Sequence, residues 1–166
     1  MSEKPVLKLP KTLSEKILDT LSILLLLGIY GFIIVNWSEI PDRIPTHFNF
    51  AGEADGWGGK ASVLILPIIA TFLFKMMFIL SKLPHIYNYP VEVTPDNAEG
   101  MYRNARKMLI TMNFFLTFFF AIGAWEMINV AQGKEGLGMW YMIGLLVSIF
   151  GTMGYYIYKM VQLRIK

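Results

Sequence analysis

The sequence contains no cysteine and few charged residues, and both shortages narrow the range of functions. Without cysteine the chain has no disulfides, no thiolate metal ligands and no cysteine nucleophile. Only 16% of its 166 residues are charged, whereas 55% are hydrophobic, and the mean hydropathy is +0.49. Such a composition lies well outside the range of soluble domains. We therefore expect a membrane protein, for which the net charge of +3 does not indicate a nucleic-acid partner.

Four apolar runs are long enough to cross a bilayer as helices. About 20 residues span the hydrocarbon layer, and the runs cover residues 17–37, 61–83, 108–130 and 137–158. The first run follows several lysines, as in a signal peptide, but no small-residue cleavage site comes after it, so we interpret it as a retained anchor. The chain is thus predicted to be an all-α integral membrane protein, a single domain of residues 1–166 with four transmembrane helices.

Lysine and arginine residues are distributed unevenly between the two sides of these spans. Eleven lie before the first span, around the second loop or after the fourth span, and three lie in the first and third loops. Because basic residues accumulate on the cytoplasmic side, both termini are predicted to be cytoplasmic and the loop 38–60 to be extracytoplasmic. An aromatic belt would then mark the outer boundary, formed by Trp37, Trp57, Trp125, Trp140 and Tyr141.

The outer loop of residues 38–60 is long for a connection between neighbouring helices, and its prolines, glycines and aromatic residues favour an ordered cap on the outer leaflet. Asp42, His47, Glu53 and Asp55 offer oxygen and nitrogen ligands, so a metal site or an acid/base pair is conceivable, although the spacing matches no established ligand pattern. The alternative is that the aspartates form turns and that His47 bonds to the backbone. The residues expected to shape or contact a binding site are Asp42, Pro45, His47, Asn49, Gly52, Asp55, Gly56, Trp57 and Lys60.

The second loop, residues 84–107, is predicted to start extended and then to form an amphipathic helix that continues into the third span. Thr94 can cap this helix, and Pro95 suits its first position. Glu99 and Arg103 have the spacing of a helical ion pair. The alternative to a docking surface is a juxtamembrane helix whose bases meet lipid phosphates. The candidate contacts with a cytoplasmic partner or with lipid are Asn97, Tyr102, Arg103 and Arg106.

Ionisable side chains inside the spans are functional candidates because hydrocarbon penalises them. Lys75 and Asn113 are expected at similar depths, where they can contact each other, with Asp19 as a countercharge. The alternative is that the long side chain of Lys75 extends to the inner headgroups.

Two further features concern the outer half of the third span and the fourth span. Glu126 is expected beneath the outer loop, where it can pair with Arg43 or Lys60. In the fourth span a small or hydroxyl residue recurs every four positions from Gly144 to Thr152, a spacing that favours close helix packing.

The run from Pro41 to Phe48, followed by Gly52 to Trp57 and by Lys60, resembles the N-terminal uncharacterised membrane domain of SdpI-type immunity proteins. The runs 88–91 and 97–99, followed by Tyr102 and Arg103, resemble the same family. The resemblance covers about residues 20–130, in a short four-helix form that lacks the C-terminal SdpI half. It implies a small bacterial inner-membrane protein. The best-studied relatives protect their producer from a membrane-active peptide toxin and signal to a cytoplasmic repressor.

These features predict a multi-pass protein of the bacterial cytoplasmic membrane that recognises a membrane-active peptide or an envelope molecule, in an SdpI-like immunity role. One alternative is an accessory subunit of a transporter or envelope complex that docks through its fourth span. Another is a small membrane enzyme that uses His47 and a carboxylate. We expect no metal and no cofactor, since no phosphate-binding or nucleophile motif is present. Expected partners are the lipid bilayer, the outer ligand, and a membrane-protein partner or a second copy.

Overall fold

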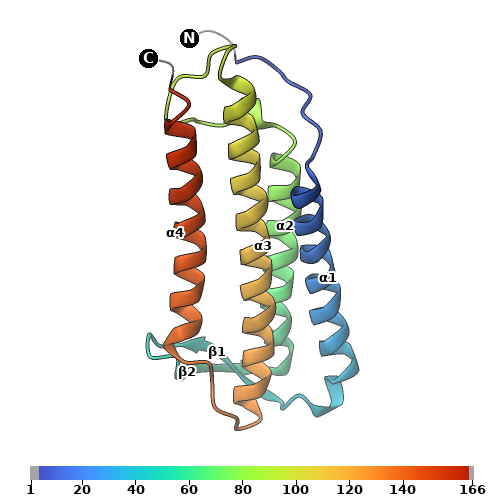
Figure 1. Cartoon of the computed structure of the whole chain (residues 1–166). Helices are drawn as coiled ribbons and strands as arrows, with labels where there is room; N and C mark the ends of the chain where they lie inside the picture. The colour runs from blue at the N-terminus through green and yellow to red at the C-terminus, as the bar shows by residue number, and fades with distance from the viewer. Residues whose placement is uncertain (1–3, 165–166) are drawn as a thin grey trace.

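Four long helices make up most of the chain in the computed structural model, which describes residues 4–164. They are α1 (Leu13–Val35), α2 (Ile65–Leu80), α3 (Ala98–Ala131) and α4 (Met139–Val161). Each is long and apolar enough to cross a membrane, α2 together with the 3₁₀ helix η2 (Lys60–Leu64) that precedes it. The protein is therefore an all-α, four-helix membrane protein, as predicted. Both chain ends lie at one end of the bundle, here called the termini end (Figure 1).

Helix α3 is the common packing partner of the bundle. It packs against α1, α2 and α4, and α1 also packs against α2 (Figure 1). With 34 residues α3 is roughly 50 Å long, which exceeds the hydrocarbon thickness. The extra turns project at the termini end, as expected for an amphipathic helix that continues into the third span. Buried side chains gather around Ile33 and Ile128 at one end of α3 and around Met101 and Tyr102 at the other.

The helix boundaries differ from the predicted ones by a few residues, for local reasons. Helix α1 starts four residues earlier than expected because Thr12 and Glu15 form a capping box. Helix α2 ends at Leu80, before Pro84 starts the 3₁₀ helix η3 (Pro84–Ile86). Helix α3 begins at Ala98, because residues 94–97 form a turn in which the backbone of Ala98 donates to Thr94 O. The predicted capping role of Thr94 is therefore wrong.

The outer loop contains regular structure that the sequence patterns did not predict. After the 3₁₀ helix η1 (Trp37–Glu39), strands β1 (Arg43–Phe48) and β2 (Ala54–Gly59) pair antiparallel in a hairpin. The hairpin lies across the end of the bundle opposite the termini, together with the α3–α4 loop (Figure 1). We call this the hairpin end. Ile44 and Val63 are fully buried there against Ile128, so hydrophobic packing fixes the hairpin on the helices.

A buried ion pair joins α1 to α3 at the termini end. Arg106 Nε donates to Glu15 Oε1 at 2.8 Å, and the guanidinium also donates to Leu9 O at 2.7 Å and Pro10 O at 3.0 Å. Arg106 is 5% exposed and Glu15 is 1% exposed. The sequence analysis placed Arg106 on an exposed face that meets lipid or a partner, and this prediction is wrong. The stretch of residues before α1 folds back over α3 and covers Arg106.

Two other predicted contact residues of this loop are buried. The Tyr102 hydroxyl donates to Pro5 O at 2.9 Å, and Asn97 donates to Glu92 O at 3.0 Å. Their assignment as partner or lipid contacts is therefore also wrong. Arg103 remains partly exposed and bonds Glu99 at 2.8 Å, as its spacing predicts.

The predicted contact between Lys75 and Asn113 is absent from the described residues. Lys75 is exposed on α2, consistent with the alternative of a side chain that extends along the lipid face. Asn113 is buried and donates to Phe74 O at 3.3 Å. Asp19 pairs with Lys11 at 2.5 Å and so is no countercharge for Lys75. Because successive helical residues point in different directions, Phe74 faces α3 while its neighbour Lys75 faces outward.

Helix α4 has the most exposed apolar surface of the four spans, with Val147 and Phe150 among the exposed residues. At Gly144 an added Cβ would lie 3.3 Å from the ring of Phe119, so close packing is confirmed there. Gly151 and Gly154, about two and three turns further on, have open space around them. Contact with α3 is thus shown at Gly144, the first residue of the four-residue pattern, while its other members, Ser148 and Thr152, are partly buried.

The orientation of the bundle can be tested with single cysteines because the natural sequence has none. Glu53 and Asp96 are exposed at opposite ends. We expect Glu53→Cys to react with a membrane-impermeant maleimide in intact cells, and Asp96→Cys to react only after lysis, since the basic residues favour a cytoplasmic termini end. The reverse labelling pattern would place the hairpin in the cytoplasm.

Removal of the buried arginine should destabilise the protein strongly. Arg106→Ala leaves the Glu15 carboxylate buried without its partner, so the free energy of unfolding should fall by about 3–5 kcal/mol. Arg103→Ala, on the same helix, breaks a partly exposed pair and should cost less than about 0.5 kcal/mol. Tryptophan fluorescence during denaturant titration in detergent measures both values. Equal losses for the two variants would contradict a structural role for the Glu15–Arg106 pair.

Candidate functional site

The hairpin, residues 43–59, packs tightly at two of its glycines, where a larger residue would not fit. His47 lies opposite Gly56, and a Cβ on Gly56 would come within 2.8 Å of His47 Cβ. At the tip, Gly52 has φ +84°, and its absent Cβ would lie 2.4 Å from Gly138 Cα. The tip backbone therefore rests directly on the start of α4. This explains why glycine is needed at both predicted positions, Gly52 and Gly56.

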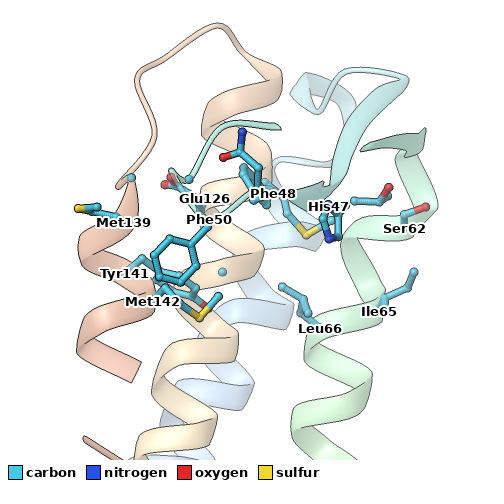
Figure 2. Close-up of a pocket in the computed structure, with 16 residues that line it drawn as sticks. His47, Phe48, Phe50, Ser62, Ile65, Leu66, Glu126, Met139, Tyr141 and Met142 are labelled. Carbon is cyan, nitrogen blue, oxygen red and sulfur yellow. The ribbon is translucent and has the colours of Figure 1, made fainter. Parts of the chain in front are cut away.

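A pocket of about 340 Å³ lies between this hairpin and the helices α2, α3 and α4. Figure 2 shows Ile65 and Leu66 of α2 on one side and Met139 and Met142 of α4 on the other, with Phe50 of the hairpin tip beside them. We call it the hairpin pocket. Its lining consists of Thr46, His47, Phe48, Asn49, Phe50, Gly52, Ser62, Ile65, Leu66, Gly123, Glu126, Met127, Gly138, Met139, Tyr141 and Met142.

The side of the pocket between α2 and α4 is formed by side chains that are also exposed at the bundle surface. Ile65 is 50% exposed, Met139 43% and Phe50 75%. All of them are apolar, and the surface around two membrane-spanning helices is occupied by lipid. The pocket is thus accessible from the side of the bundle as well as from the hairpin.

Polar groups of the hairpin stand at the pocket margin. His47 Nδ1 lies 2.5 Å from Asp55 Oδ1, and both side chains are exposed. This contact orients the imidazole and directs its Nε2 away from the carboxylate. At the tip, Asn49 accepts a hydrogen bond from the Glu53 backbone at 3.0 Å and donates to its carboxylate at 2.9 Å. The alternative that His47 bonds to the backbone is wrong, since its ring contacts the Asp55 side chain, and the turn contact at the tip is made by Asn49 rather than by an aspartate. The His47–Asp55 pair is the only acid/base combination of the predicted set that the described residues bring together.

Glu126 is the buried carboxylate of the pocket. It lies beneath the hairpin, as predicted, but it accepts a hydrogen bond from the backbone N–H of Leu137 in the α3–α4 loop. The predicted pairing with Arg43 or Lys60 is wrong. Arg43 lies 6.0 Å from the Trp57 ring and Lys60 lies 5.1 Å from the Trp37 ring, where each cation meets an aromatic face.

The predicted site residues divide into two groups. His47, Asn49, Gly52 and Glu126 line the pocket, and Asp55 and Gly56 border it through their contacts with His47. The others do not line it. At the base of the hairpin the backbone N–H of Lys60 donates to the carbonyl of Asp42, and neither residue lines the pocket. Pro45 is buried and Trp57 is exposed, and they do not line it either.

Most of the pocket wall comes from residues that the sequence analysis did not single out. Tyr141 is the clearest case, because its hydroxyl donates to Phe119 O at 2.7 Å and passes above Gly123, where a Cβ would come within 2.7 Å of it. Such residues carry no sequence signal beyond membrane-helix hydrophobicity, since only the packing of α2, α3 and α4 brings them together. Within residues 4–164, no group of three His, Asp or Glu side chains is placed to hold a metal ion.

Comparison with known proteins finds a similarity that is centred on the hairpin. Residues 23–71 match a family model described as a domain of unknown function, DUF1648. The matched segment runs from the middle of α1 through the hairpin into α2. An uncharacterized protein of Archaeoglobus fulgidus is 29% identical over 101 residues, which is 60% of this chain and 54% of the relative, so the chain spans about half the length of that relative. No solved structure matches.

The close contact at the hairpin tip predicts a sharp difference between two glycines. In Gly52→Ala the new methyl group meets the Gly138 backbone, and the positive φ adds strain of about 1–3 kcal/mol. Gly59→Ala lies in the same hairpin with open space around it and should be nearly neutral. Limited proteolysis of the hairpin and the melting temperature in detergent measure the difference. Indistinguishable behaviour of the two variants would show that the tip does not rest on α4.

Proposed function

We propose that the protein is a membrane-embedded recognition protein that binds an amphiphilic molecule in the hairpin pocket. The occupant is a membrane-active peptide or a lipid-linked envelope molecule, and protection against such a peptide is the finer form of the proposal. The observation that carries it is a pocket with apolar walls and a few polar groups at its hairpin side, reached between two membrane-spanning helices. The resemblance to SdpI-type immunity proteins supports the same function.

The chemistry of the lining matches an amphiphile with one polar end. Methionine and aromatic side chains on α4 and the hairpin adapt to irregular apolar groups. His47, Asn49 and Glu126 offer hydrogen-bonding groups at the hairpin side. An occupant bound in this way keeps its polar end beneath the hairpin and its apolar part among Ile65, Leu66 and the lipid.

A small membrane enzyme is the second candidate, and the His47–Asp55 pair is the observation that favours it. An imidazole whose Nδ1 faces a carboxylate can act as a general base through Nε2. Ser62 lines the same pocket, yet its Oγ lies toward Gly58, where a Cβ would be 3.0 Å away. A binding function is therefore the better supported of the two.

Two tryptophan substitutions on α2 test the recognition function. Ile65 and Ile68 are both exposed, but only Ile65 lines the pocket. We expect Ile65→Trp to fill the pocket mouth and to weaken binding of a cationic amphipathic peptide by about tenfold or more, equivalent to about 1.4 kcal/mol. Survival of expressing cells in a panel of such peptides should fall as a result. Ile68→Trp should behave as the natural sequence does. Survival of cells and expression level by immunoblot are measured for each.

The same panel separates the two candidates. His47→Gln with Asp55→Asn removes the acid/base pair but leaves the apolar walls in place. If protection depends on catalysis, this double variant loses it while still binding a fluorescent peptide. Protection that is unaffected by Ile65→Trp at equal expression would refute recognition through this pocket.

A further inference from the structure

A second cavity, separate from the hairpin pocket, lies at the termini end of the bundle. Its volume is about 590 Å³, and it lies between the segment 6–11, which precedes α1, and the segment 81–85, which follows α2. The sequence analysis assigned no role to either segment beyond orientation. We call it the lysine cavity.

The described lining of the lysine cavity is basic. It contains Lys8, Lys11, Lys82, His85 and Arg106, and no carboxylate among the lining residues. Two of the charges are neutralised from outside the lining, Lys11 by Asp19 and Arg106 by Glu15. Within residues 4–164, Lys8 and Lys82 form no ion pair. Both are exposed, so the cavity is bordered by two ammonium groups that no carboxylate of the described residues pairs.

One aromatic ring holds two of these lysines at the cavity. Lys11 Nζ lies 4.4 Å and Lys82 Nζ 4.5 Å from the ring centroid of Phe78, although the two residues come from segments far apart in the sequence. Each cation gains from contact with the ring. Because Asp19 already pairs with Lys11, the capacity for binding an anion that is left at this ring is that of Lys82.

The carbonyl oxygens at the end of α2 are hydrogen-bonded, so their partial negative charge repels an anion in the lysine cavity only weakly. The last carbonyl oxygens of a helix carry partial negative charge, which would repel an anion. At this end Leu80 O accepts from the Tyr87 hydroxyl at 2.6 Å, and Phe78 O accepts from Ser81 Oγ at 2.8 Å. Burial raises the pKa of Tyr87 to about 12, against the opposing effect of Arg106, so this hydroxyl remains a donor.

We propose that the lysine cavity binds the phosphate group of an anionic membrane lipid. Lysine ammonium groups bind phosphate as point charges, and Lys8 and Lys82 supply two of them without a competing carboxylate. The cavity is at the end of the α2 span, where lipid headgroups lie, and its volume admits a phosphate with its glycerol. A soluble phosphate has the same chemistry, and the experiment separates the two sources.

The test compares two double variants that remove the same charge. Lys8→Gln with Lys82→Gln removes the uncompensated cavity lysines, whereas Lys16→Gln with Lys75→Gln removes exposed lysines of α1 and α2 that do not line the cavity. Each purified protein is mixed in detergent with phosphatidylglycerol or phosphatidylcholine, and bound lipid is counted by native mass spectrometry. We expect the natural protein to retain phosphatidylglycerol in preference, and the cavity variant to bind it roughly fivefold more weakly for each cation removed.

Further arms identify the source and guard against misfolding. Lys8→Arg with Lys82→Arg keeps both charges and should keep phosphatidylglycerol binding. In a further arm, inorganic phosphate is added to the protein with bound lipid. If phosphate displaces the lipid and raises the melting temperature, and does so only when Lys8 and Lys82 are present, the natural occupant is a soluble phosphate and not a lipid. Equal loss of phosphatidylglycerol in the cavity and the control variants, or no preference over phosphatidylcholine, would overturn the proposal.

Discussion

The packing of the other three helices and of strand β1 against α3 is the constraint on which the remaining structure depends. In a bilayer the hydrophobic effect does not drive helices together, so their association relies on close packing and on polar contacts. Here α3 provides both at its two ends. Near the hairpin, Ile128 belongs to the core that buries Ile44 and Val63, and near the termini Arg106 binds Glu15. Both cavities lie beside α3, between segments that pack against it. The hairpin pocket lies between the hairpin, α2 and α4, and the lysine cavity lies between the segments 6–11 and 81–85.

The Glu15–Arg106 pair illustrates how costly polar contacts are used. Desolvating both charges is unfavourable, and a buried pair contributes little net stability compared with apolar packing. Its geometry, however, is demanding, because the guanidinium also holds the carbonyls of Leu9 and Pro10. It therefore fixes the path of the segment before α1, and with it the position of the lysines that line the adjacent cavity.

The four membrane-spanning helices were predictable because hydrophobic length alone identifies them, whereas the orientation inferred from the lysine distribution stays a prediction. The hairpin was not, because its strand β2 is rich in glycine and β1 contains Pro45, both of which disfavour a strand assignment. The predicted exposure of Arg106 and the predicted contact of Lys75 with Asn113 were wrong for one common reason. A helical pattern indicates which residues share a face, but not which neighbouring segment covers that face.

For the candidate site, local motifs identified His47, Asn49, Gly52, Asp55 and Gly56 because turn chemistry and close backbone approach leave a sequence signal. The walls formed by α2 and α4 leave none. Ile65, Met139 and Met142 are ordinary membrane residues in the sequence, and only their position beneath the hairpin gives them a role.

The exposed side of the hairpin pocket between α2 and α4 affects which molecules the pocket can distinguish. A closed cavity discriminates by total size, whereas a recess open to the hydrocarbon holds only the portion of a molecule that enters it. Chain length and branching beyond Ile65 and Met139 then contribute little to the binding free energy, because that portion exchanges one apolar environment for another. If the protein binds an amphiphile as proposed, molecules with the same polar head and different apolar tails therefore bind with similar affinity.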